Sequence, residues 1–227
     1  MAPKSRKAAL EQQATSLFRD KGYAATSMRD LATHFGVEAA SLYSHIRNKE
    51  ELLYNICFPL AQDLFAGLEN LPKDLSATER LLQALISHVT LITRSPDQSI
   101  VFLQEYRHLS EPARTEFLNM RKAYEQKFKL IIRQGIRSGE FRKIDEKITT
   151  LALLSAVNST PYWFRKESGL EASWVATLLS DILIHGLSNK TKSLQESEGQ
   201  VRRKVAVRKG VGKVEKITKT KTSTKTK

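Results

Sequence analysis

Residues 22–53 read GYAATSMRDLATHFGVEAASLYSHIRNKEELL, and this stretch decides the fold class. Its apolar residues recur at helical spacing rather than in the alternation of a strand. Ser27, with Asp30 three residues later, forms a capping-box pattern that begins a helix, and Gly36 is a suitable residue to end it. The stretch therefore predicts a short helix followed by a turn.

A second short helix is expected immediately after that turn, over about 39–46. Leu42 and Ile46 stand four residues apart and would share its inward face. Asn48 with Glu51 then begins a longer helix. Two short helices joined by a tight turn and braced by longer ones can present the second short helix to a DNA groove. Spacing alone is weak evidence, because many proteins that never bind DNA contain such a pair.

Helical periodicity continues on both sides of this stretch, and no segment alternates like a strand. The sequence therefore predicts an all-α fold. Pro59 is expected to kink the helix that follows Asn48. Further helices are expected from about 10 to Gly22, after Ser76 with Glu79, after Ser95 with Pro96, and over about 112–138, 145–164 and 170–187.

Charge is distributed unevenly along the 227 residues, whose formal net charge is +13. Residues 190–227 contain 13 Lys and Arg against 3 Glu, so this segment carries +10 and the rest of the chain only +3. Its Lys- and Thr-rich composition is typical of disorder. A basic tail can bind nucleic acid or simply keep a chain in solution, so charge alone assigns no function.

Composition argues against export and against membrane insertion. No apolar segment approaches the roughly 20 residues that a membrane span needs, and the basic first residues lead into no signal-peptide core. Cys57 is the only cysteine, so an internal disulfide is impossible. We expect a cytoplasmic protein without a membrane partner.

Enzymatic function is not expected. The sequence contains no Gly-rich phosphate loop, no pair of histidines at metal-binding spacing and no nucleophile motif around Cys57, which reads as a buried apolar residue. We therefore expect no catalytic residue, no metal site and no cofactor.

Several short motifs in the first 64 residues, at fixed spacings from one another, give a specific match to a known family. These motifs are GYAATSMRDLA (22–32), FGV (35–37), SLYSHI (41–46) and NKEELL (48–53). With these motifs the sequence resembles the TetR (tetracycline repressor) family over about 5–64 without gaps. Glu38 departs from the family's usual Ser or Thr helix cap, and Ile46 replaces its usual Phe.

The resemblance implies which residues contact DNA. Thr26, Ser27, Tyr43, His45 and Lys49 would bind backbone phosphates and so position the protein without reading sequence. Bases would be read by the exposed face of the second short helix, with Glu38, Ala39, Ala40, Ser41 and Ser44. Arg29 of the first short helix would also read a base.

Three of these residues have simpler alternative roles. The Tyr43 ring could cover the core of the small domain instead of touching phosphate. His45 could be a solvated helix end, and Glu38 a solvated acid at a helix N-terminus.

The same resemblance implies three parts of the chain: a helix-turn-helix domain over 5–65, a helical regulatory and dimerisation domain over 66–189, and a basic tail over 190–227. The last two helices carry apolar residues on more than one side, as expected if one face packs inside and another binds a second subunit. A larger monomeric core would give the same pattern.

The middle helices resemble those of regulators that respond to acyl-coenzyme A thioesters. Arg121, Tyr124, Asn158 and Trp163 are the expected contacts to such an effector. The expected function is thus that of a homodimeric regulator that a small molecule releases from double-stranded operator DNA. The resemblance implies a repressor, because repression is the commoner outcome in the family. The alternative is a nonspecific DNA-compacting protein that acts through its basic tail.

Overall fold

The computed structural model describes residues 6–44, 46–165 and 169–186, and these residues are almost entirely helical. The all-α prediction is confirmed. In chain order the elements are α1 (Arg6–Lys21), α2 (Met28–Phe35), α3 (Ala39–Tyr43), α4 (Lys49–Glu69), α5 (Ala77–Arg94), α6 (Pro96–Gln104), the 3-10 helix η1 (Glu105–His108), α7 (Ala113–Arg137), α8 (Glu146–Asn158), α9 (Thr160–Trp163) and α10 (Ala172–His185).

Local signals fix most of the helix ends where the sequence placed them. Helix α1 ends before Gly22, whose φ of 82° is the left-handed conformation that glycine adopts readily. Gly36, with φ of 66°, ends α2 in the same way. Ser27 and Ser76 each form the predicted capping box, with Asp30 and Glu79 respectively. Pro59 lies inside α4, and the helix continues past it to Glu69.

Two predicted helices are shorter than expected. The helix predicted over 39–46 ends at Tyr43, where the backbone N–H and the hydroxyl of Ser44 both bond back to the Ser41 carbonyl and close the last turn. The helix predicted over 145–164 stops at Asn158, and α9 follows as a separate short helix. Pro161 accounts for the break, because it has no N–H and its ring disfavours a continuous helix through the preceding turn.

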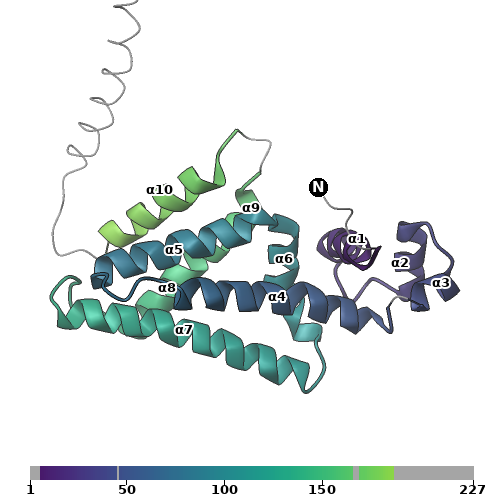
Figure 1. Cartoon of the computed structure of the whole chain (residues 1–227), viewed down its shortest axis with the longest axis horizontal. Coiled ribbons are helices and arrows are strands. Elements are labelled where there is room, and N and C mark those ends of the chain that lie inside the picture. The colour runs from purple at the N-terminus through teal and green to yellow at the C-terminus, as the bar shows by residue number, and fades with distance from the viewer. Residues whose placement is uncertain (1–5, 45, 166–168, 187–227) are drawn as a thin grey trace, which may run out of the picture. The chain divides into compact units, whose positions relative to one another are not determined.

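Helix α4 connects two hydrophobic cores. Its first half, with Leu52 and Ile56, belongs to a core that α1, α2 and α3 share with parts of α6, η1 and α7. Its last turns contribute Leu68 to a second core, built by α5, α7, α8 and α10. Figure 1 shows α4 passing from the group α1–α3 into the bundle of the other helices. A change in the bundle can therefore reach α1–α3 through a continuous element.

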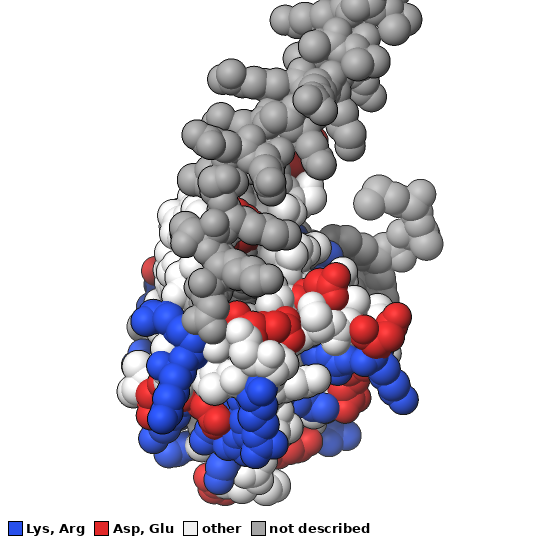
Figure 2. Space-filling model, turned by 90° about the vertical axis from the view of Figure 1, so that its left-hand side faces the viewer, with Lys and Arg blue, Asp and Glu red and all other residues white. Residues whose placement is uncertain are grey.

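The surface at the far end of that bundle carries mixed charge. Figure 2 shows Lys and Arg side chains interleaved with Asp and Glu there, so this face offers no field of a single sign. None of the helices described in the structure is long and apolar enough to span a membrane. The predicted disorder and role of the basic tail fall on 190–227, outside the described residues.

Candidate nucleic-acid interface and effector cavity

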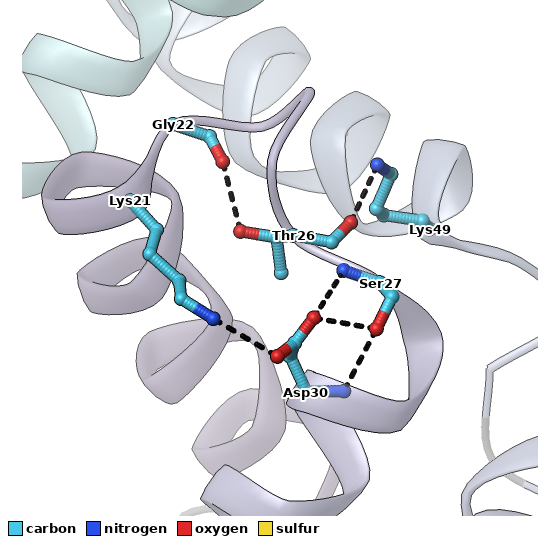
Figure 3. A network of polar contacts seen from close by, with 6 residues as sticks. All are labelled: Lys21, Gly22, Thr26, Ser27, Asp30 and Lys49. Carbon is cyan, nitrogen blue, oxygen red and sulfur yellow. Dashed lines mark hydrogen bonds and ion pairs between the residues drawn. The ribbon is translucent and has the colours of Figure 1, made fainter.

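The N-terminus of α2 is held by a network of polar contacts around Ser27 (Figure 3). The Ser27 hydroxyl accepts from the Asp30 N–H at 3.1 Å, and the Asp30 carboxylate accepts from the Ser27 N–H at 2.8 Å. Lys21 of α1 donates to the same carboxylate at 2.9 Å. The bonds from Ser27, followed by the one from Lys21, hold the pKa of Asp30 well below its ordinary value. The capping box thus fixes the start of α2, and the Lys21 bond connects it to α1.

Thr26 and Ser27 differ in their access to a phosphate. Thr26 is buried, and its hydroxyl donates to the Gly22 carbonyl at 2.8 Å. Ser27 is exposed at the start of α2. A phosphate approaching this helix end would meet Ser27 and the first backbone N–H groups before it met the Thr26 hydroxyl.

Lys49 braces the loop between α1 and α2. Its ammonium group donates to the carbonyls of Tyr23 and Thr26, at 2.8 and 2.6 Å, and lies 4.1 Å from the centre of the Tyr23 ring. Burial lowers its pKa, against a smaller opposing effect of the Asp30 charge. Two of its three N–H donors are therefore committed inside the protein. The predicted phosphate contact would use the third.

Helix α3 presents a small polar surface. Leu42 and Ile46 are buried and anchor it, while Ala40, Ser41 and Ser44 are exposed. Glu38 is the N-cap residue and is exposed, and its side chain makes no capping hydrogen bond. Ala39 begins the helix, and His45 lies outside the described residues. The predicted base-reading residues of this helix therefore lie on a face that a DNA groove could cover.

Tyr43 points away from the core. Its side chain is 56% exposed, which does not support the alternative in which the ring covers the domain. Arg29 on α2 is also exposed and forms no ion pair with any residue in the described part of the chain. Both remain predicted DNA contacts.

Arg47 was missed by the sequence reasoning. It is exposed between α3 and α4, and its backbone N–H donates to Glu51 at 2.9 Å. A basic residue directly before the Asn48 helix cap was the available signal. Its guanidinium group is a further candidate for a phosphate contact.

Tyr43 and Lys49 can be separated by experiment. Tyr43→Ala should weaken binding to operator and random DNA alike, by about tenfold, because a phosphate contact carries no sequence information. It should change the stability little, because the side chain is exposed.

Lys49→Ala should also weaken binding to both kinds of DNA. It should lower the melting temperature and reduce the slope of log affinity against log salt by about 0.9, the value expected for one lost phosphate contact.

Titrations at several salt concentrations and thermal unfolding of the same samples measure both effects. The exposed Lys73→Ala, on the loop between α4 and α5, is the matched control and should change neither. An unchanged salt slope with a lowered melting temperature would make Lys49 a purely structural brace.

A cavity lies among α4, α5, α6, α7 and α8. Three of the four predicted effector contacts, Arg121, Tyr124 and Asn158, line it together. Its other lining residues are mostly apolar: Ala61, Leu64, His88, Phe102, Leu103, Phe117, Met120, Glu125, Leu151, Leu154 and Ser155. Trp163 is not among them. It lies on α9, 49% exposed, with its indole N–H 3.4 Å from the Ser159 hydroxyl.

His88 was also missed by the sequence reasoning, and it joins two of the predicted residues. Its Nε2 lies 3.0 Å from Asn158 Oδ1 and its Nδ1 lies 2.9 Å from the Tyr124 hydroxyl. Burial lowers the pKa of His88 to about 4, against the smaller effect of the Asn158 bond, so the ring is neutral at pH 7. Asn158 Oδ1 can only accept, so with the amide in this orientation Nε2 carries the proton and the Tyr124 O–H donates to Nδ1.

Helix α6 connects the cavity to the helices that hold α3. Phe102 lines the cavity, and Asp97 in the first turn of the same helix pairs with Arg19 of α1 at 2.5 Å. Gln98 donates to the Ile56 carbonyl of α4 at 3.0 Å. A displacement of α6 by a molecule in the cavity would therefore act on α1 and α4 directly.

Helices α8 and α10 each carry exposed apolar side chains. Ile148 is 64% exposed on α8, and Trp174, Leu178 and Ile182 follow at intervals of four residues on α10 with exposures of 41% to 59%. Large apolar residues spaced in this way form a continuous strip on a helix. An exposed apolar strip of this kind is typical of a subunit interface.

These features define a two-part regulator, in which a helix-turn-helix unit is joined through α4 and α6 to a helical domain with an internal cavity. Two family models match the chain: "Bacterial regulatory proteins, tetR family" over residues 12–56 and "Tetracyclin repressor-like, C-terminal domain" over residues 74–187. The chain belongs to the TetR family of bacterial transcriptional regulators.

Individual relatives agree with this assignment. The transcriptional repressor KstR2 of Mycolicibacterium smegmatis is 25% identical over 189 residues, covering 82% of this chain and 92% of the relative. The solved structure of PfmR, a TetR family regulator from Thermus thermophilus, is 30% identical with a TM-score of 0.71 and covers 83% of this chain and 100% of that one. AibR, solved with isovaleryl coenzyme A and operator DNA, is 24% identical with a TM-score of 0.67, covering 81% and 98%.

Proposed function

We propose that this protein is a repressor that binds operator DNA as a homodimer and releases it when an acyl thioester of coenzyme A occupies the cavity. Within this proposal, residues 5–65 bind DNA and residues 66–189 bind the effector and the second subunit. The predicted contacts on α2, α3 and the start of α4 bind DNA, and the protein acts in the cytoplasm. The relatives reported above are regulators, which is in line with a non-enzymatic role.

The single observation that carries the proposal is the double role of α6. This helix lines the cavity through Phe102 and Leu103 and contacts α1 and α4 through Asp97 and Gln98. In a dimer, two copies of α3 must match successive major grooves, about 34 to 36 Å apart. An effector that favours a shifted α6 would also favour a different separation of the two α3 helices, and operator affinity would fall.

The effector class is supported by the cavity and by one relative. The lining is largely apolar with a few polar groups, as an acyl chain with one or two oxygen atoms requires. The structure of AibR contains isovaleryl coenzyme A, which shows that a chain of this fold can hold a short acyl thioester. Arg121, at the exposed rim, would lie near the part of the ligand that remains in solvent.

The test uses the full chain, an operator selected from a random DNA pool, and a panel of acyl-coenzyme A esters of increasing chain length. At an ester concentration 100 times its Kd, binding should stabilise the protein by about 2.7 kcal/mol and raise the melting temperature by several degrees. The same ester should weaken operator binding. Free coenzyme A is the control. If no ester moves the melting temperature, the ligand class is wrong.

Asp97→Asn tests the route through α6. The ion pair between Asp97 and Arg19 is partly exposed, so its loss should cost less than about 1 kcal/mol of stability. The ester that gives the largest thermal shift should bind the variant as it binds the wild type but weaken operator binding by a smaller factor. Asp63→Asn, which breaks a similarly exposed pair with Arg94 between α4 and α5, is the control. Equal release by the wild type and by Asp97→Asn would contradict this route.

A further inference from the structure

The inner end of the cavity is here the part lined by the buried His88 with the half-buried Tyr124 and Asn158, as opposed to the rim with the exposed Arg121 and Ser155. We propose that this inner end selects an effector whose apolar part carries a neutral oxygen group, a ketone or a hydroxyl, and that Tyr124 and Asn158 bind this group while His88 positions them. The inference rests on the proposed function in one respect, that an effector occupies this cavity. The inference specifies a further chemical feature of the effector, the neutral oxygen group on its acyl chain, in addition to the length of that chain and the coenzyme A moiety.

His88 has no hydrogen-bonding capacity left for a ligand. Its two ring nitrogens are engaged by Tyr124 and Asn158, at 2.9 and 3.0 Å, and the residue is buried. Because the neutral ring has one donor and one acceptor, it fixes the direction of both bonds. His88 is therefore a positioning residue. The groups that can bind a ligand are the hydrogen-bonding groups of Tyr124 and Asn158 that are not bonded to His88.

Those remaining groups are one donor and one acceptor. The Tyr124 oxygen has given its proton to His88 and can still accept, while the amide Nδ2 of Asn158 can donate and bonds to no residue described in the structure. Both residues lie on the cavity wall. A ketone can accept from the Asn158 amide, and a hydroxyl can also donate to Tyr124.

The surroundings disfavour a charged group at the same place. Most of the other lining side chains, among them Leu64, Phe117 and Leu154, are apolar. The one cationic lining residue, Arg121, is exposed and lies 3.6 Å from the Glu125 carboxylate, with which it pairs. A carboxylate at the inner end would lose its hydration without gaining a counter-ion. A plain methyl end would leave the Asn158 amide without a partner, which also costs free energy.

Three coenzyme A esters with six-carbon acyl chains test the selectivity by calorimetry on the full chain. Hexanoyl-, 5-oxohexanoyl- and adipoyl-coenzyme A differ only near the far end of the chain, which is apolar, ketonic and anionic respectively. The ketone ester should bind about tenfold more tightly than hexanoyl-coenzyme A, and the adipoyl ester more weakly than both. Equal or tighter binding of the hexanoyl or adipoyl ester would overturn the proposal.

Variants assign the selectivity to the named groups. Asn158→Leu should reduce the preference for the ketone over the hexanoyl ester to within about twofold. Tyr124→Phe should do the same for the preference for 5-hydroxyhexanoyl-coenzyme A, because only a hydroxyl can donate to the Tyr124 oxygen. Ser155→Ala, at the exposed rim of the same cavity, should keep both preferences. His88→Gln should weaken binding of the ketone ester more than binding of the hexanoyl ester and so lower the ketone preference, a result that a general loss of packing would not give. A ketone preference that survives Asn158→Leu would also overturn the proposal.

A second pair of probes separates this inference from the proposed function. If none of the three esters binds, coenzyme A thioesters are not the effectors, and the inner end is then tested with hexan-2-one and hexanoate alone. With histidine labelled by nitrogen-15, hexan-2-one should shift the His88 ring resonances and hexanoate should not. No shift with the ketone, or a shift with hexanoate, would refute the selectivity itself.

Discussion

Replacing Ser41 by glutamate should lower operator affinity by at least about 100-fold, while the melting temperature stays within about one degree of the wild-type value. Ser41 is exposed on α3, whereas Leu42 and Ile46 are buried and anchor that helix in the core. A substitution at Ser41 should therefore affect stability little. A carboxylate there would enter a groove flanked by phosphates and would displace close contacts with base edges. Losing one or two base contacts at about 1–3 kcal/mol each corresponds to this factor.

The measurement is a binding titration on the selected operator at fixed salt, with thermal unfolding of the same samples. Gln83→Glu on α5 adds the same charge at an exposed position outside α1–α3, and it should leave operator affinity within about twofold. If Ser41→Glu binds the operator as the wild type does, α3 is not the helix that enters the groove.

Short-range signals in the sequence predicted the fold well. Caps and C-terminal glycines act over a few residues, so the starts of α2 and α5 and the end of α1 could be located from Ser27, Ser76 and Gly22. The break between α8 and α9 was also present in the sequence, at Pro161. It was missed because the apolar pattern continues across it, and periodicity does not reveal the hydrogen bond that proline removes.

The candidate sites were only partly predictable, because their residues are joined by tertiary contacts. A lone histidine on an apolar helix gives no sign of its partners, and His88 meets Tyr124 and Asn158 from 36 and 70 positions away. Lys49 was assigned to phosphate by resemblance. Its bonds to the carbonyls of Tyr23 and Thr26 depend on how α4 packs against the preceding loop, which no local pattern reports.

His88 should make the protein lose stability as the pH falls from 6.5 towards 4. Its pKa is about 4 in the folded protein and about 6.5 in an unfolded chain, because burial disfavours the charged ring. Above pH 6.5 both states are neutral and His88 gives no pH dependence. Between the two values only the unfolded chain binds the proton, so the free energy of unfolding falls by about 1.4 kcal/mol per pH unit, and by on the order of 3 kcal/mol in all.

Urea unfolding at pH 7, 6 and 5 and at one fixed protein concentration measures this slope. His88→Gln keeps an uncharged polar side chain that cannot titrate, so the free energy of unfolding of this variant should vary less over this pH range. By pH 5 the free energy of unfolding of the wild type should be close to that of the variant or below it. The hydrogen bonds and ion pairs of Asp30 and Glu146 lower the pKa of those acids, so their contribution to stability is lost only below their ordinary pKa values, about 4, outside this window. His34→Gln, at an exposed position on α2, should retain the wild-type slope.

Parallel pH profiles for the wild type and His88→Gln would show that His88 is not held neutral by burial. The directions assigned to its two hydrogen bonds would then be wrong.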